Sequence, residues 1–200
     1  PATAAEATDT VRVVTASKPQ AEQDGMSHAL LVDGIALCRF LSWLNVHGVG
    51  RTEVAISDHL LALRHEAESG IGPSFHTIAG TGPNAAIMHY APTPEHCDTV
   101  QADTFLLIDS GGQYTDATTD VTRTVWMGTG TLPEAWKTHY TCVLKGLISL
   151  HSAVFPVGMP AYSLVSLVWL ALWHEGMDFD HGAGHGVGSC LSVHEWPLGF

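Results

Sequence analysis

The run Thr104–Met127, TFLLIDSGGQYTDATTDVTRTVWM, constrains the fold of this chain more than any other segment. Four apolar residues at 105–108 predict a buried strand that leads into Asp109, and a glycine-containing turn follows. Asp120 then opens a second run, Val121–Trp126, whose residue types favour extended backbone. Two strands joined in this way form a hairpin. We therefore expect the carboxylates of Asp109 and Asp120 to lie close together.

Carboxylates a few ångströms apart repel each other, so such a pair needs a shared proton or a cation between them. Oxygen ligands suit Mn²⁺, Mg²⁺ or Ca²⁺, and an added imidazole shifts the preference toward Mn, Fe, Co or Zn. Imidazoles are available near the end of the chain, in the glycine-rich segment HGAGHGVG at 181–188 and in His194. Without the histidine segment, acids beside Gly and Thr would be more typical of turns, where their side chains bond backbone amides.

Three co-linear blocks resemble a known family. DSGGQYTDATTDVTRT and HGAGHGVGSCLSVHE are similar to signatures of the pita-bread metallopeptidases, and within them of aminopeptidase P (Xaa-Pro aminopeptidase). SFHTIAGTGPNAAIMHYAP, at Ser74–Pro92, matches a third block. The resemblance implies an α+β fold of the pita-bread (creatinase/aminopeptidase-like) type, truncated at its C-terminus. We expect residues 1–23 to be a linker or residual connection and residues 24–200 to be part of the catalytic domain.

The resemblance also implies a site with two metal ions, expected to be Mn²⁺, with Zn²⁺ or Co²⁺ as alternatives. Asp109 would chelate one ion, Asp120 would bridge both, and His185 would be the imidazole ligand. A hydroxide shared by the two metals would attack the scissile carbonyl.

Three further histidines match non-ligand histidines of the family. His89 and His194 would stabilise the intermediate and move a proton, which suits imidazole because it titrates near neutral pH. His181 would line the substrate pocket. The implied substrate is a peptide with proline at its second position, from which the residue before proline is removed.

The chain departs from the family pattern at its end. The family has two further glutamate ligands, which would follow Phe200, and Glu195 belongs to the VHE motif instead. We therefore expect weakened metal binding and an exposed sheet edge and apolar face. Whether this 200-residue piece is active stays open, as does a separate C-terminal fragment. The alternatives are a prolidase or methionine aminopeptidase relative, or a non-catalytic pita-bread module that binds peptide or protein. The metal-free creatinase type is disfavoured, because it lacks the acidic ligands retained here.

Charge and composition exclude some partners. The formal net charge of −12 disfavours nucleic acid and anionic membranes. No uninterrupted apolar stretch approaches the roughly 20 residues of a membrane span. The four cysteines are widely spaced; Cys38 and Cys142 fit core positions, and a reducing, cytoplasmic location is expected. Relatives suggest a homodimer for the full-length protein.

Local patterns predict the remaining elements. Apolar periodicity predicts a helix from Gly25 to about Gly48 and a second helix with Thr52 as its N-cap. His76–Ala79 and Ala85–Tyr90 are predicted as strands, and residues 91–103 as a loop.

Two more helices are expected further along the chain. A capping box at 131–134 predicts the first, whose Trp136 and Leu147 belong to an apolar stripe expected to be core. The second covers about 163–175 and ends at Gly176.

Overall fold

The computed structural model describes residues 9–199, so the first eight residues of the predicted linker and Phe200 lie outside the described residues. The helices are α1 (Thr10–Ala16), α2 (Gln20–His47), α3 (Glu53–His65), α4 (Glu134–His151) and α5 (Val165–Trp173), with 3-10 helices η1 (Gly82–Ala86) and η2 (Ala161–Leu164). The strands are β1 (Gly70–Pro73), β2 (Ile78–Thr81), β3 (Phe105–Ser110), β4 (Gly112–Tyr114), β5 (Val121–Trp126), β6 (His185–Gly186) and β7 (Glu195–Gly199).

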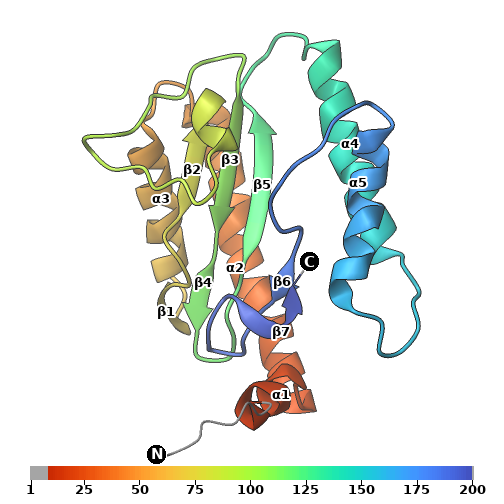
Figure 1. The fold of residues 1–200 in the computed structure, drawn as a ribbon. Coiled ribbons are helices and arrows are strands. Elements are labelled where there is room, and N and C mark those ends of the chain that lie inside the picture. The colour runs from red at the N-terminus through yellow and green to blue at the C-terminus, as the bar shows by residue number, and fades with distance from the viewer. Residues whose placement is uncertain (1–8, 200) are drawn as a thin grey trace, which may run out of the picture.

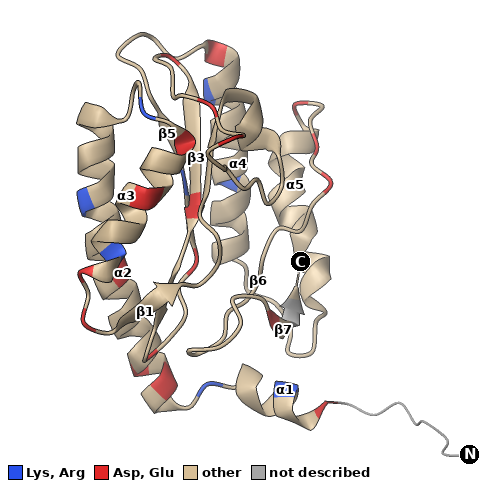
Figure 2. Ribbon diagram, turned by 90° about the vertical axis from the view of Figure 1, so that its left-hand side faces the viewer, with Lys and Arg blue, Asp and Glu red and all other residues tan. Residues whose placement is uncertain are grey.

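The centre of the molecule is a three-stranded antiparallel sheet in the order β2-β3-β5. Helices α2 and α3 cover one face of this sheet, and α4 and α5 pack together beyond β5 (Figure 1). The short β6–β7 pair lies on the opposite face from α2 and α3, as the side view also shows (Figure 2). Acidic residues, red in Figure 2, are spread over several elements rather than gathered in one patch.

The core lies between α2, α3 and the sheet. Leu106 and Ile108 of β3 point into it and are almost fully buried, together with Phe40, Leu44 and Ile56 of the two helices. Each such side chain contributes about 1.5–3 kcal/mol by leaving water. Because successive side chains of a strand alternate between faces, the residue after Ile108 points to the other face of the sheet.

A buried polar network ties the helices to β4. Arg64 of α3 donates to both carboxylate oxygens of Asp33 in α2, at 2.6 and 3.1 Å. The Tyr114 hydroxyl of β4 donates to Asp33 Oδ1 at 2.8 Å. Asp33 and Tyr114 are 1% exposed and Arg64 is 4% exposed, so these groups depend on one another rather than on water.

Helix ends follow the sequence where a local signal exists. α2 ends at His47 with Gly48 as its C-cap, as predicted. The Thr52 hydroxyl accepts a hydrogen bond from Ala55 N at 3.2 Å, which confirms the predicted N-cap of α3. Near the end of α5 the chain turns at Gly176, whose φ of +69° suits a residue without a side chain.

Other local predictions are wrong. Ala85–Tyr90 is not a strand: Pro83 and the preceding glycine start η1, and loop residues follow it. The capping box at 131–134 does not form, because Pro133 itself occupies the N-cap of α4 and no side chain caps that helix. The predicted linker contains α1 and the first turn of α2, which starts at Gln20 rather than at Gly25.

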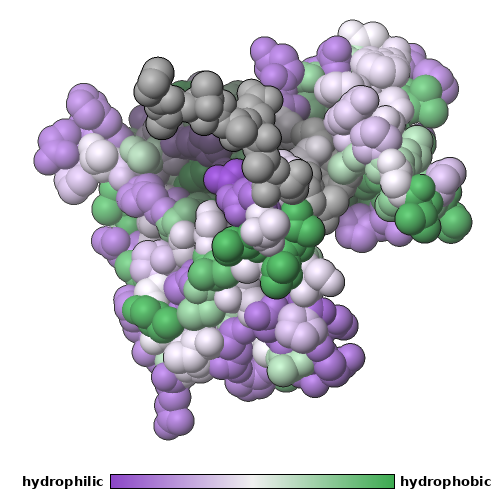
Figure 3. Space-filling view, turned by 60° about the horizontal axis from the view of Figure 1, so that its bottom comes forward, coloured by the Kyte–Doolittle hydropathy of each residue, from purple (hydrophilic) through white to green (hydrophobic). Residues whose placement is uncertain are grey.

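The apolar stripe on α4 is exposed, although a core position was predicted. Only Cys142 and Gly146 of this helix are buried, and an added Cβ at Gly146 would crowd the backbone of Val168 in α5. The small residue at this position lets the two helices approach closely. The larger side chains of α4 lie outside this contact, and those of Trp136 and Tyr140 pack on Phe105 of β3. The residues of the exposed stripe are 36–55% exposed: Trp136, Tyr140, Val143, Leu144, Leu147 and Ile148. Figure 3 shows hydrophobic side chains exposed in several separate groups on the face that it presents.

By length and composition alone, α2 could cross a membrane, with a mean hydropathy of 1.5 over its most apolar window. The sequence pattern had not indicated such a stretch. The helix nevertheless contributes Phe40 and Leu44 to the core and Asp33 to the buried network, and a core helix passes the same test. Within residues 9–199 the cysteines are free; Cys142 is buried as predicted, whereas Cys38 is exposed.

Candidate metal centre

The hairpin places Asp109 and Asp120 on one face of the sheet, opposite α2 and α3. Asp109 pairs with Thr122 across β3 and β5, and the Thr122 hydroxyl donates to Asp109 Oδ1 at 2.7 Å. Asp120 lies two residues before Thr122, so the alternation of an extended chain directs both side chains to the same face. Thr122 was not singled out from the sequence, although its two-residue spacing from Asp120 could have indicated it.

Gly111 makes this close approach of the two segments possible. A Cβ at this position would collide with the carbonyl oxygen of Thr119 and with the Ser74 hydroxyl. The Thr119 hydroxyl in turn accepts a hydrogen bond from Gly112 N at 2.9 Å. The tight turn predicted from the two glycines therefore brings the residue before Asp120 against the end of β3.

His185 reaches the acidic pair from β6. Its Nε2 lies 3.1 Å from Asp120 Oδ2, with the imidazole 29% and the carboxylate 20% exposed. Its Nδ1 lies 2.8 Å from the carbonyl oxygen of Gly186, which accepts a hydrogen bond from the protonated Nδ1. A neutral ring then presents an unprotonated Nε2 to a carboxylate, so either a second proton or a cation must lie between them.

Electrostatics at the hairpin favour a cation. Burial and then the nearby Asp109 carboxylate raise the pKa of Asp120, and His185 and His194 oppose this rise. A half-buried acid whose ionisation is opposed by a neighbouring carboxylate is stabilised in its charged form by a positive ion. Two carboxylates and one imidazole are the donor types that Mn, Fe, Co or Zn accepts. Among residues 9–199, however, no three His, Cys, Asp or Glu side chains converge closely enough to form a complete metal cage.

Two of the three remaining predicted histidines join this cluster. The His194 ring packs edge-on against His185, with 4.2 Å between the ring centroids. The His89 ring lies 6.4 Å from the His194 ring and comes from the loop after η1. His181 packs instead on Phe179 at 4.5 Å and bonds the carbonyl of Gly182. The structure thus brings together Asp109, Asp120, His185, His194 and His89, and places His181 further along the glycine-rich loop.

Anchors that sequence reasoning missed fix the histidine-bearing loop. The Thr118 hydroxyl donates to the carbonyl of Leu191 at 2.8 Å, and the Ser189 hydroxyl donates to the carbonyl of Asp116 at 3.1 Å. Lys18, in the predicted linker, forms an ion pair with Glu195, and both side chains are largely buried. The Glu195 carboxylate is therefore neutralised by a cation of the chain itself.

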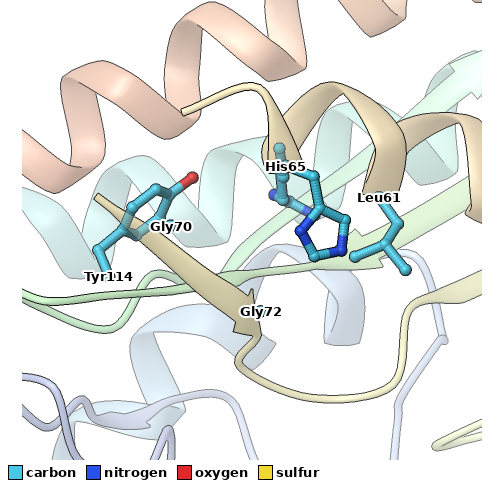
Figure 4. A pocket seen from close by; sticks show the side chains of 6 residues that line it. Leu61, His65, Gly70, Gly72 and Tyr114 are labelled. Carbon is cyan, nitrogen blue, oxygen red and sulfur yellow. The ribbon is translucent and has the colours of Figure 1, made fainter. Parts of the chain in front are cut away.

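A separate depression lies between α3, β1 and β4, next to the buried Asp33–Arg64 pair (Figure 4). Leu61, His65 and Tyr114 line it, and it has no room for a water molecule. It is a packing gap and offers no second binding site.

The metallopeptidase family M24 model matches residues 24–200. The chain belongs to metallopeptidase family M24. Among M24 relatives, the chain is 47% identical over 188 residues to a probable Xaa-Pro aminopeptidase P of Verticillium alfalfae, covering 92% of this chain and 30% of that protein. It is 44% identical over 195 residues to the corresponding protein of Chaetomium globosum, covering 92% and 31%. The chain thus spans about 30% of the length of these M24 relatives.

Solved structures of M24 enzymes share the fold. The X-prolyl aminopeptidase of Caenorhabditis elegans, described as a cytosolic enzyme with a di-nuclear active site, is 41% identical with a TM-score of 0.90, covering 96% of this chain and 32% of that one. The prolidase of Pyrococcus furiosus, 24% identical, matches with a TM-score of 0.79 over 94% of this chain and 53% of its own. The predicted α+β pita-bread fold of this M24 chain is confirmed.

Proposed function

We propose that this chain is part of the catalytic domain of a two-metal aminopeptidase that removes an N-terminal residue preceding proline. The observation that carries the proposal is the pairing of His185 Nε2 with Asp120 beside Asp109, in the order and spacing of the family signatures. Similarity to Xaa-Pro aminopeptidases at 41–47% identity supports the substrate class. The C. elegans enzyme's di-nuclear site supports two ions, for which we propose Mn²⁺.

Asp109, Asp120 and His185 would hold the ions. Bound divalent ions would supply a hydroxide nucleophile at neutral pH and polarise the scissile carbonyl. The Thr122 hydroxyl fixes Asp109 Oδ1, and the Gly186 carbonyl fixes the ring of His185, so both ligands are oriented before anything binds.

His194 and His89 would handle protons. Both residues are exposed, so a peptide can reach their side chains. His194 lies against His185, close enough to the proposed metal ligands to donate a hydrogen bond to the developing oxyanion. His89, whose ring lies 6.4 Å from that of His194, would protonate the proline nitrogen as it leaves. A peptide bond before proline is a tertiary amide, so protonation of that nitrogen assists departure.

His181 would contact the substrate rather than the ions. Its ring and that of Phe179 form a partly apolar surface on the same loop. Such a surface suits a proline ring better than a charged side chain. The proposal further includes a cytosolic location, which the description of the C. elegans enzyme supports, and peptide partners rather than nucleic acid, in line with the net charge of −12.

The experiment is a peptidase assay on the whole protein, purified with chelator and reloaded with Mn²⁺. We expect release of the first residue from an Xaa-Pro-Xaa peptide and none from the same peptide with alanine in place of proline. Asp120→Asn and His185→Ala should each abolish turnover, whereas Asp58→Asn, an exposed acid on α3, should not. Cleavage confined to Xaa-Pro dipeptides would favour a prolidase. Tight peptide binding without turnover would favour a non-catalytic module.

A further inference from the structure

Glu53, the first residue of α3, is a buried acid that the proposed chemistry does not use. It is 0% exposed, yet no Lys, Arg or His side chain within residues 9–199 forms an ion pair with it. A buried carboxylate is costly unless hydrogen bonds replace its water. Its position therefore requires donors from elsewhere in the fold.

The donors come from a single segment, residues 81–98. Thr81 N at the end of β2 donates to Glu53 Oε1 at 2.7 Å, and Asp98 N at the far end of the loop donates to Oε2 at 2.8 Å. Between them, Asn84 Nδ2 reaches both oxygens at 3.1 and 3.2 Å. The Tyr90 hydroxyl donates to Oε2 at 2.7 Å. One carboxylate thus holds both ends and two interior points of an 18-residue loop.

The donors also bind one another. Asn84 Nδ2 lies 3.1 Å from the Tyr90 hydroxyl and 3.0 Å from Asp98 Oδ2. Burial and the Glu53 carboxylate raise the pKa of Tyr90, so its hydroxyl keeps the proton that it donates. Loss of the Glu53 carboxylate would leave Tyr90 and Asn84 without their shared acceptor and would release the loop interior.

His89 lies immediately before the anchored Tyr90. Its φ of 54° is in the left-handed region, which residues with side chains rarely adopt unless the surroundings fix them. With the Tyr90 ring held at Glu53, this backbone conformation leaves the His89 ring 6.4 Å from that of His194. The residue held by Glu53, Tyr90, and the proposed catalytic group, His89, are therefore neighbours in the chain.

We propose that Glu53 is a positioning residue: through Tyr90 it fixes the left-handed backbone of His89 and thereby holds the His89 ring beside His194. This inference rests on the proposed function, in which His89 contacts the leaving group. Glu53 lies at the start of α3, on the opposite face of the sheet from the proposed metal ligands. From there it would determine where the His89 ring lies during the reaction.

The first arm of the test measures anchoring without any assay of activity. Amide hydrogen exchange by NMR is compared for the original chain, Glu53→Gln, Tyr90→Phe and the control Asp58→Asn, an exposed acid on the same helix. Glu53→Gln should speed exchange at Thr81 and Asp98 by roughly 10- to 100-fold, the loss expected for hydrogen bonds to a charged group. Tyr90→Phe should leave those two amides protected and change only the signals around His89. Unchanged exchange and unchanged His89 signals in both variants would overturn the anchoring.

The second arm measures turnover in the whole protein. Both variants should lower kcat by roughly 10-fold or more with little change in KM, since a misplaced proton donor impairs the chemical step. The kcat–pH profile is also measured for His89→Gln. The limb of the profile that is lost in His89→Gln should be flattened in both Glu53→Gln and Tyr90→Phe. A merely structural role would lower the melting temperature and leave that limb intact, which would overturn the proposal. If Glu53→Gln does not fold, Tyr90→Phe still reports the His89 signals, the change in kcat and the pH profile.

The two arms separate this inference from the proposed function. An original protein without peptidase activity would refute the function, while the exchange data would still report on the anchor. An active protein whose Tyr90→Phe variant keeps its kcat and its pH profile would refute the positioning role and leave the function standing.

Discussion

Removing the Arg64 cation should destabilise the fold far more than removing an exposed one. In Arg64→Met, the Asp33 carboxylate keeps only the Tyr114 hydroxyl as a donor, while being 1% exposed. Breaking a buried ion pair in this way costs about 3–5 kcal/mol, because a charge is left without compensation. For a chain of this size each kcal/mol lowers Tm by about 2–4 °C, so the expected loss is roughly 6–20 °C.

Urea unfolding followed by tryptophan fluorescence and by circular dichroism measures the change. The midpoint should fall and the slope should stay constant, which indicates a change in stability alone. The control is Arg39→Met: Arg39 pairs with Glu66 at 2.6 Å, but both side chains are more than half exposed. Such a pair contributes about 0–1 kcal/mol.

A double variant tests whether Asp33 and Arg64 depend on each other. Asp33→Leu combined with Arg64→Met removes both charges and leaves only the Tyr114 hydroxyl unsatisfied, at a cost of about 1–3 kcal/mol for that group. The double change should therefore cost less than the sum of the single changes. Additive losses, or a loss below about 1 kcal/mol for Arg64→Met, would refute the argument that these groups depend on each other.

Three further predictions follow from the hairpin and its surroundings. Because burial and Asp109 raise the pKa of Asp120, the chain without metal should lose stability as pH rises through that folded pKa. Asp120→Asn should therefore raise Tm in the presence of chelator at pH 7 but not at pH 3. An equal rise at both pH values would contradict this. Gly111→Ala should lower the free energy of unfolding by about 1–3 kcal/mol, because its Cβ would collide with the Thr119 carbonyl. The control Gly34→Ala, at a position on α2 with open space around it, should be neutral or stabilising. Equal melting temperatures for the two variants would show that the turn can relax. Burial and Asp33 raise the pKa of Tyr114 above 10.0, so stability should fall as pH rises above that value. In an absorbance titration, Tyr114→Phe should remove one tyrosine ionisation that otherwise accompanies unfolding. Normal titration of Tyr114 in the folded chain would contradict this.

Sequence reasoning succeeded where a signal is local or where spacing fixes geometry. The Thr52 cap and the glycine-stopped end of α2 depend on neighbours within one turn. The approach of Asp109 to Asp120 follows from strand alternation and a glycine turn, and His185 was found through its surrounding motif. These parts of the fold and of the candidate site could be predicted without tertiary information.

The failures have a common physical origin in contacts between distant segments. The apolar run at 85–90 resembles a strand, but Asn84 and Tyr90 are drawn to Glu53, more than 30 residues away, and the chain becomes a loop. The stripe on α4 has the period of a core helix, yet α5 packs on this helix at the small residue Gly146. Lys18 has an apparently unstructured polar context and nevertheless pairs with Glu195. None of these partners is visible in a local window.

The Asp120–His185 contact joins residues 65 positions apart, and this separation sets the order in which the site can be made during synthesis. At roughly 5–20 residues per second, a ribosome completes the acidic hairpin about 3–13 s before it adds His185. Until then the two aspartates face each other without an imidazole, so an ion at the proposed metal site would be held by oxygen alone. Oxygen-only sites suit Mg²⁺, Ca²⁺ or Mn²⁺. Under the proposed function, the cation that the nascent chain first meets would therefore be selected by different chemistry from the one that it keeps after the glycine-rich loop closes.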